Sequence, residues 1–177
     1  MRASAALFEP DTLEELIPRI RGSIRIGEHS SAADLVAMDP IGATEAVAYD
    51  FLSKGGKHSR PFITLATYDA LTGGRATQRD GDKTIAGWTN SVKRTAMSIE
   101  TFHKASLVHD DIEDDDPFRY GEQTIHNRYG TPTAINIGDY LIGMGYRFVS
   151  TESRTLGAEV TADILDVLAE AHTRLSE

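Results

Sequence analysis

The chain has 177 residues and a formal net charge of −9, a length that suits one domain with a real core and is too short for two comfortable ones. Outside one acidic cluster it is only mildly acidic, so we expect no binding to nucleic acid. It has no cysteine, no signal-peptide pattern at its start and no apolar run near the roughly 20 residues that span a bilayer, so we expect a cytoplasmic protein without disulfides, thiolate metal sites or stable membrane insertion.

Apolar residues recur at helical spacing along the chain, and no convincing period-two alternation is present, which predicts an all-α domain. We divide the chain into residues 1–35, an N-terminal helix and a polar break, and residues 36–177, the helices of a bundle. The first helix is predicted from an N-cap at Asp11 to about Ile24, and the polar break follows at residues 27–31.

Two helices are predicted next, each starting at a proline and stopping at a pair of glycines. The first begins at Asp39-Pro40 and ends at Gly55-Gly56, and the second begins at Pro61 and ends at Gly73-Gly74. The apolar residues assigned to them are Val47, Phe51 and Leu52 in the first, and Phe62, Ile63, Leu65, Ala66 and Leu71 in the second. Residues 75–82 are predicted to form an exposed polar loop.

A stripe of residues spaced by three or four runs from Lys83 into the acidic cluster and predicts one helix of about 30 residues, roughly 45 Å long, ended by Pro117. Its members are Ile85, Trp88, Val92, Ala96, Ile99, His103, Ser106, Asp110 and Asp114. A stripe that served only core packing would gain nothing by ending on paired charges. We therefore interpret its acidic end as a binding site.

Six of the seven residues from Asp110 to Asp116 are acidic, a density that repels itself unless a cation compensates it. On a helix, Asp110 and Asp114 lie one turn apart, with Asp111 beside them. Oxygen ligands with few protein donors suit Mg²⁺, which bridges carboxylates to the phosphates of a substrate. The cluster therefore predicts a diphosphate site, and a solvated acidic helix end is the alternative.

Beyond the cluster, the pattern predicts a helical turn at residues 125–129, a helix opened by Thr131-Pro132, and a last helix from about Ala158 to Ser176. Glycines 138, 143 and 145 within the middle helix indicate close approach to another helix. The apolar residues assigned to the two helices are Ile135, Ile137, Leu141, Ile142, Met144 and Phe148 in the first, and Val160, Ile164, Leu168 and Leu175 in the second.

The segment GGKHSRP, residues 55–61, joins two predicted helices. Its glycines let backbone approach a ligand, while Lys57 and Arg60 place two cations beside a helix N-terminus. Read alone, the segment fits a helix stop with surface basic residues equally well. Combined with the acidic cluster, it predicts one Mg²⁺-bridged and one metal-free diphosphate site, and hence two diphosphate substrates.

These motifs together resemble those of the trans-isoprenyl diphosphate synthases, or polyprenyl synthetases, over about residues 51–148. GGKHSRP resembles the GGKxxRP element of the family, ASLVHDDIEDDDPFRYG resembles its first aspartate-rich motif, DDxxD, and GTPTAINIGDYLIG resembles its helix with a Gly-Asp pair, here Gly138-Asp139. The resemblance implies the first half of an isoprenoid synthase-type antiparallel helix bundle. It also implies a Mg²⁺-dependent prenyltransferase that condenses an allylic diphosphate with isopentenyl diphosphate.

The resemblance assigns roles to individual residues. Asp110, Asp111 and Asp114 would bind Mg²⁺ on the allylic diphosphate, with Arg119 contacting the same group, and Gly56, Lys57, Arg60 and His103 would bind isopentenyl diphosphate. Phe102, Ala105 and Ser106 would line the pocket for the growing chain. Because Ala105 and Ser106 are small, we expect a deep pocket and products of about twenty carbons or more.

Two features depart from the family pattern. Members usually have two arginines before the glycine, the second of which helps hold isopentenyl diphosphate, whereas this chain has Arg119-Tyr120-Gly121. In addition, no second aspartate-rich motif follows Asp116. We therefore expect a hetero- or homo-oligomer in which a partner chain supplies that motif.

Two alternatives stay open. One is a non-catalytic regulatory or substrate-binding subunit of a heteromeric prenyl synthase, which Tyr120 and the missing motif favour. The other is a terpene cyclase-type fragment, which would ionise its substrate through the aspartate-rich motif without needing an isopentenyl pocket.

Overall fold

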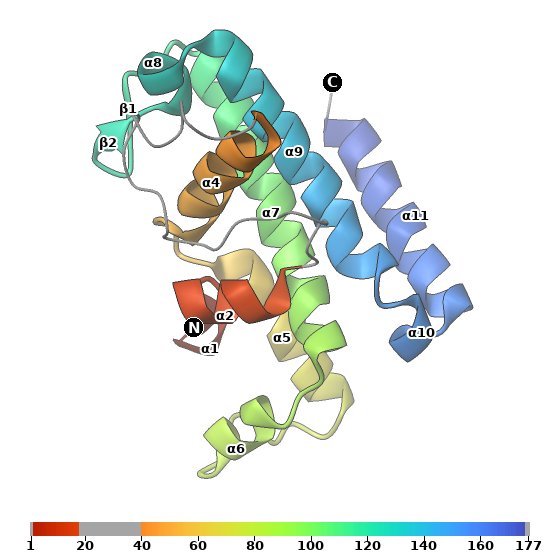
Figure 1. Ribbon diagram of the computed structural model, residues 1–177. Helices are drawn as coiled ribbons and strands as arrows, with labels where there is room; N and C mark the ends of the chain where they lie inside the picture. Colours follow the sequence, from red (N-terminus) through yellow and green to blue (C-terminus); the bar gives the residue numbers. More distant parts are fainter. Residues whose placement is uncertain (1, 18–39, 176–177) are drawn as a thin grey trace.

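The computed structural model describes residues 2–17 and 40–175 as an assembly of packed helices with one small hairpin (Figure 1). Its elements are α1 (Arg2–Ala6), α2 (Pro10–Leu16), α4 (Pro40–Ser53), α5 (Ser59–Leu71), α6 (Gly81–Ala86), α7 (Asn90–Glu113), β1 (Phe118–Arg119), β2 (Glu122–Gln123), α8 (Ile125–Tyr129), α9 (Thr131–Ser150), α10 (Ser153–Leu156) and α11 (Ala158–Leu175). The predicted all-α class is confirmed, since the two strands hold only two residues each.

Helices α7 and α9 form the centre of the molecule and lie side by side (Figure 1). Helix α5 packs against α7, α4 packs against α9, and α11 covers the outer side of α9. The side chains at most 1% exposed between the two central helices include Met97, Ala105 and Val108 of α7, and Ile137, Leu141, Met144 and Phe148 of α9. Burial of this apolar surface is the main force that holds the helices together.

Two glycines of α9 let α7 come close. A Cβ atom at Gly138 would lie 2.3 Å from Nε2 of His109, and one at Gly145 would lie 2.9 Å from the ring of Phe102. Neither distance is compatible with a side chain in a closely packed interior. The predicted close approach is therefore confirmed at these two positions and wrong at Gly143, where a Cβ would meet no atom within 4 Å.

The helices on either side of the Gly-Gly loop, residues 54–58, differ in how well the pattern predicted their burial. The residues expected to be buried in α4, namely Val47, Phe51 and Leu52, are buried. Of the five apolar residues assigned to α5, only Leu65 is buried, whereas Ala66 is exposed and Phe62, Ile63 and Leu71 are 40%, 61% and 82% exposed. The buried face of α5 carries Pro61, Leu65 and Asp69 at four-residue spacing, so the apolar residues between them point outward.

The first predicted helix corresponds to α2, which begins at Pro10 after an N-cap at Glu9. Asp11 therefore lies in the first turn, and the predicted cap at Asp11 is wrong. Proline opens the helix one residue earlier because its φ is already fixed near the helical value. The predicted extension to Ile24 and the polar break at residues 27–31 lie outside the described residues.

The single long helix predicted from Lys83 is also wrong. Helix α6 ends at Ala86, the chain turns through residues 87–89, and α7 begins at Asn90 and runs for 24 residues. The Thr89 hydroxyl accepts a hydrogen bond from the amide of Val92 at 3.5 Å, so a new N-cap follows the glycine that interrupts the helix.

Between α7 and α8 the chain forms a hairpin that the pattern did not predict. Phe118 pairs with Gln123, and Arg119 pairs with Glu122. The two turn residues, Tyr120 and Gly121, have φ values of +55° and +84°. Positive φ at both central positions is typical of the tight turn that joins two-residue hairpins. The hairpin thus returns the chain toward α7.

Helix α11 packs on α9 and α10 and leaves part of its apolar surface uncovered. Val160, Val167 and Leu175 are 48%, 65% and 86% exposed, while Ile164 and Leu168 are half-buried. Across residues 2–17 and 40–175, none of the helices has both the length and the apolar character needed to cross a membrane.

Candidate diphosphate site

Helix α7 presents three different faces in the half that precedes the acidic cluster. Phe102 and His109 meet α9. Glu100, Lys104 and Asp111 are buried, at most 2% exposed. The third face, called here the open face, carries His103, Ser106 and Asp110 and continues into Asp114. The polar end of the stripe predicted from the sequence therefore lies on the open face. The buried residues Lys104 and Asp111 each follow a stripe residue, His103 and Asp110, by one position.

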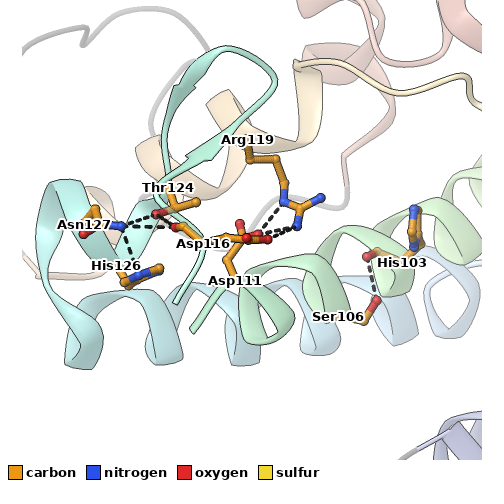
Figure 2. Close-up of polar contacts among 8 residues, drawn as sticks. All are labelled: His103, Ser106, Asp111, Asp116, Arg119, Thr124, His126 and Asn127. Atoms are coloured by element: carbon orange, nitrogen blue, oxygen red, sulfur yellow. Dashed lines mark hydrogen bonds and ion pairs between the residues drawn. The ribbon is translucent and has the colours of Figure 1, made fainter. Parts of the chain in front are cut away.

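Asp111 is the member of the DDxxD motif that faces the hairpin. Nε of Arg119 donates a hydrogen bond to its Oδ1 at 2.5 Å, and Nη2 of Arg119 contacts the same oxygen (Figure 2). The hydrogen bond to Asp111 is the main cause that raises the pKa of Arg119. The second oxygen of Asp111, Oδ2, is buried without a hydrogen-bond partner. Asp111 thus anchors Arg119 and keeps one acceptor free.

The hairpin that carries Arg119 is itself tied down. The carbonyl oxygen of Asp116 accepts hydrogen bonds from Oγ1 of Thr124 at 2.8 Å and from Nδ2 of Asn127 at 3.2 Å (Figure 2). These bonds join the end of the acidic segment to α8. The guanidinium group of Arg119 is therefore fixed at the end of α7 in two ways, by its ion pair with Asp111 and by the hydrogen bonds that hold the hairpin.

Asp110 and Asp114 are exposed, one helical turn apart, on the open face. Across the described segments, no three histidine, aspartate or glutamate side chains are gathered closely enough to form a metal site by themselves. The oxygens at this end of α7 fit Mg²⁺ in kind, because Asp110 and Asp114 offer two exposed carboxylates and one buried oxygen of Asp111 has no hydrogen-bond partner. The assignment of these three aspartates to Mg²⁺ stays a prediction.

The charges of three cations act on His103, which lies on the open face of α7. Burial is the main cause that lowers the pKa of His103 to about 4, and the charges of Arg60, Lys104 and Arg119 lower it further, against the opposing effect of Asp110. His103 is therefore neutral near pH 7 and can donate a hydrogen bond. Arg60, which the sequence placed in the anion pocket, thus acts on the same imidazole as Arg119.

The Gly-Gly loop has an unusual backbone. Gly55, Gly56 and His58 have φ values of +61°, +94° and +45°. A Cβ at Gly55 would lie 2.4 Å from the ring of Tyr120, so only glycine fits there. Lys57 is exposed, and no hydrogen bond or ion pair of its side chain is found within residues 40–175. Its predicted contact with diphosphate stays a prediction.

Lys104 and Tyr120 complete this side of the site. The ammonium group of Lys104 donates to the carbonyl oxygen of Lys54 and lies 4.3 Å from the centroid of the Tyr120 ring. No sequence motif marked Lys104 as a residue of the site. One signal was available, since this lysine lies among Thr101, Ala105 and Val108, where a charge needs a buried partner.

The Gly-Asp pair of α9 has a packing role. The imidazole of His109 occupies the space that a side chain at position 138 would fill. Its Nε2 lies 3.6 Å from a carboxylate oxygen of Asp139. The pair therefore positions α9 against the last turns of α7, directly below the aspartates.

The three residues assigned to the chain-length pocket are not gathered around one cavity. Ala105 is 1% exposed in the core, and Ser106 is on the open face, where its hydroxyl donates to the carbonyl oxygen of His103 at 2.9 Å (Figure 2). The ring of Phe102 packs edge-on against Tyr146 of α9, with centroids 4.7 Å apart, and against His172 of α11. A cavity of about 180 Å³ lies elsewhere, between α4, the Gly-Gly loop, the hairpin and α8.

Comparison with known proteins places this geometry in a family. Residues 43–177 match the family model described as Polyprenyl synthetase. A geranylgeranyl pyrophosphate synthase of Geoglobus acetivorans is 38% identical over 116 residues, which cover 66% of this chain and 32% of the relative. The chloroplastic small subunit of a heterodimeric geranylgeranyl pyrophosphate synthase of Arabidopsis thaliana is 33% identical over 112 residues, which cover 62% of this chain and 30% of the relative.

Solved structures share the fold. A geranylgeranyl pyrophosphate synthetase from Geoglobus acetivorans matches with a TM-score of 0.57 and 29% identity over 85% of this chain and 38% of that one. A geranyltransferase from Helicobacter pylori, complexed with magnesium and isoprenyl diphosphate, matches with a TM-score of 0.60 and 24% identity over 93% of this chain and 48% of that one. The chain spans about a third of the length of the curated relatives it matches. Since the family model covers more than half of the chain, the protein belongs to the polyprenyl synthetase family.

Proposed function

We propose that the chain is the N-terminal, diphosphate-binding part of a Mg²⁺-dependent trans-isoprenyl diphosphate synthase, which condenses an allylic diphosphate with isopentenyl diphosphate. The observation that supports this most is that Arg60, in the first turn of α5, and Arg119, in strand β1, both lower the pKa of His103 through their charges. His103 lies two helical turns before Asp110 on the open face of α7. One surface of the helix therefore offers cations at one end and carboxylates at the other.

In this reaction the bond between the allylic carbon and its diphosphate breaks, the double bond of isopentenyl diphosphate attacks the resulting cation, and a proton is lost. Asp110, Asp111 and Asp114 would hold Mg²⁺, which, when bound, neutralises the charge that develops on the departing diphosphate. Arg119 donates hydrogen bonds to the same diphosphate, held in place by Asp111. Donors fixed before the reaction cost no reorganisation when the charge develops.

Isopentenyl diphosphate would bind without metal at the cationic end of the open face of α7, away from the aspartates. Lys57 and Arg60 supply charge, Gly56 supplies backbone that can approach the phosphates, and neutral His103 supplies a hydrogen-bond donor. The relative from Helicobacter pylori was solved with magnesium and an isoprenyl diphosphate, and that structure supports this class of ligand through shared fold alone.

The growing hydrocarbon chain would leave the carboxylates along the open face. Ser106 is the residue of the expected pocket that lies on this face, one turn before Asp110. Because it is small, it leaves room for long products. Ala105 and Phe102 do not lie on this face. Ala105 is buried in the core, and Phe102 packs against Tyr146 of α9 and His172 of α11.

The remaining wall of the active site would come from residues that correspond to the rest of the relatives, on a longer polypeptide or on a partner chain. Helix α11 supports this, because its exposed valines and leucine form a surface ready to be covered. The relative from Arabidopsis thaliana is named as one subunit of a heterodimer. That name and Tyr120 favour a second candidate, a subunit that binds diphosphate without catalysing the reaction.

A coupled experiment separates these candidates. The chain is incubated with Mg²⁺, isopentenyl diphosphate and labelled allylic diphosphates, alone and with chains that carry a second aspartate-rich motif. A synthase part gives elongated diphosphates in a competent assembly, and the Asp110→Asn variant abolishes them. A non-catalytic subunit binds diphosphate, but Asp110→Asn leaves the product yield of the assembly unchanged. Release of cyclic hydrocarbon without isopentenyl diphosphate would instead identify a terpene cyclase.

A further inference from the structure

Lys104 is a fully buried cation that the proposed chemistry does not use. Its side chain projects from α7 under the Gly-Gly loop, and the residue is 0% exposed. The ammonium group donates to the carbonyl oxygen of Lys54 and lies 3.4 Å from that of Gly55. It also lies 4.3 Å from the ring centroid of Tyr120 and 5.1 Å from that of Phe51. Two backbone carbonyls and two aromatic faces thus surround one charge.

The orientation of those carbonyls fixes the orientation of two amides. In a trans peptide the C=O and N–H groups point in opposite directions, and the described part of the chain contains no cis peptide. If the carbonyls of Lys54 and Gly55 point at Lys104, the N–H groups of Gly55 and Gly56 point away from it. Both glycines are exposed, and neither amide donates a hydrogen bond to another described residue.

Successive backbone amides of a turn can together form a concave site for anions. The loop turns at Gly55 and Gly56, which both have positive φ and amides without a partner among the described residues, and Arg60 follows at the start of α5. Glu100, one turn before Lys104 and 2% exposed, raises the pKa of Lys104 through its charge and so offsets part of the charge of the ammonium group, while its Oε1 lies 3.6 Å from Nδ1 of His58 and 3.5 Å from where a Cβ at Gly56 would be. The contribution of Lys104 to anion binding therefore comes mainly from the peptide orientation that it imposes.

Tyr120 holds this arrangement together from the hairpin. Its ring lies against Cα of Gly55, where any Cβ would clash at 2.4 Å, and it also covers the ammonium group of Lys104. An aromatic ring at position 120 can share space with the buried ammonium group, whereas a second cation there would repel it. Tyr120 is thus matched to Lys104.

We propose that Lys104 is a positioning residue of the metal-free diphosphate site, where it turns two peptide groups of the Gly-Gly loop so that the amides of Gly55 and Gly56 bind the phosphates. This inference rests on the proposed function, because that function supplies the diphosphate ligand. An arginine at position 120 would bind the diphosphate by direct contact. In this chain, Lys104 and Tyr120 would instead support diphosphate binding by holding the Gly-Gly loop in place. Burial lowers the pKa of Lys104 to about 8, against the opposing effect of Glu100, so the ammonium form that donates still predominates at pH 7.

The test is binding of inorganic pyrophosphate and of isopentenyl diphosphate, measured by calorimetry with EDTA present to exclude metal-bound sites. Lys104→Met keeps most of the length of the side chain and removes its charge, and we expect binding at least about tenfold weaker, a loss of about 1.4 kcal/mol. Lys93→Met, on the same helix and three turns away from the loop, is the matched control and should bind like the wild type. The double variant Lys104→Met with Tyr120→Arg should recover affinity to within about threefold of the wild type, an effect that a purely structural role of Lys104 does not predict.

A second measurement on the wild-type chain needs no variant. In amide NMR spectra, the signals of Gly55 and Gly56 should shift on titration with pyrophosphate. The inference is overturned if these signals stay in place while the ligand binds, or if Lys104→Met binds within twofold of the wild type; the proposed function then survives. If the wild type binds neither ligand, the metal-free site of the proposed function fails together with this inference.

Discussion

Arg119 reaches from the hairpin to the carboxylate of Asp111 and turns the middle aspartate of the motif inward, so that the three aspartates of DDxxD do not face the same way. Asp110 and Asp114 stay exposed, while Asp111 is 2% exposed and holds a guanidinium group. One motif therefore combines two exposed carboxylates with a buried carboxylate that supports the neighbouring arginine.

This support predicts a loss of stability when Asp111 is neutralised. Asp111→Asn leaves the partly buried Arg119 facing a neutral group, and we expect a decrease in the free energy of unfolding of about 2 kcal/mol. The matched control is Asp116→Asn, because the Asp116 carboxylate lies 3.5 Å from Nη2 of Arg119 at an exposed position and should matter by less than about 0.5 kcal/mol. Urea denaturation measures both. Equal effects of the two variants would contradict the anchoring role of Asp111.

The packing of α9 on α7 predicts opposite effects at two glycines of the same helix. Gly138→Ala places a methyl group against His109 and should destabilise the fold by about 1–3 kcal/mol. Gly143→Ala points into open space and should stabilise it by about 0.5–1 kcal/mol, since alanine loses less conformational entropy in a helix than glycine. Thermal unfolding of both variants checks the sign. A stabilising Gly138→Ala would mean that His109 moves aside freely.

Local signals explain which parts of this fold the sequence could predict. Prolines at helix starts and glycine pairs at helix ends act on their own residues, so the bounds of α4 and the end of α5 followed from them, whereas α5 begins at Ser59, two residues before the predicted start at Pro61. Gly87 is the same kind of signal, because it ends α6, but the stripe of residues that continues past it predicted one unbroken helix. The hairpin was missed because Tyr120, with φ of +55°, is not a residue that normally marks such a turn.

The buried face of α7 could not be read in the same way. Helix α7 carries apolar residues on several of its faces, so periodicity alone could not decide which face packs against a neighbouring helix. Tertiary packing selected the face of Met97, Thr101 and Val108, and with it Lys104, whose charge is accommodated only because the Gly-Gly loop supplies carbonyl oxygens. That loop is about fifty residues away in the sequence, beyond the reach of any local pattern.

The three cations around His103 predict a pH dependence of stability. Its pKa is about 4 in the folded chain and near the ordinary 6.5 in the unfolded chain, so the unfolded chain binds more protons between these values. Stability should therefore fall as the pH drops from about 6.5 to about 4, with no further loss from this group at lower pH. His103→Gln removes this contribution, and its free energy of unfolding, measured by urea denaturation at several pH values, should fall less steeply. Parallel curves for the two proteins would contradict the low pKa of His103.

The open face of α7 predicts control of product length. Ser106→Phe places a large ring one turn before Asp110, where the proposed product would pass, and should shorten the product of a competent assembly. Ser106→Ala keeps the site small and should leave the product unchanged. Chromatography of the dephosphorylated products measures chain length. Identical products from both variants would place the growing chain elsewhere.

Metal-dependent binding supplies a test of the aspartate assignment that needs no partner chain. If Asp110 and Asp114 share a Mg²⁺ ion that bridges to phosphate, addition of Mg²⁺ should strengthen the binding of pyrophosphate to the wild type, and EDTA should reverse the gain. Asp110→Asn and Asp114→Asn should each lose most of that gain while retaining metal-free binding at the Gly-Gly loop. Asp115→Asn is the matched control, because the Asp115 side chain is 96% exposed and asparagine tolerates its φ of +53°. Calorimetry with and without Mg²⁺ separates the two sites, and an unchanged gain in Asp110→Asn would exclude Asp110 as a ligand.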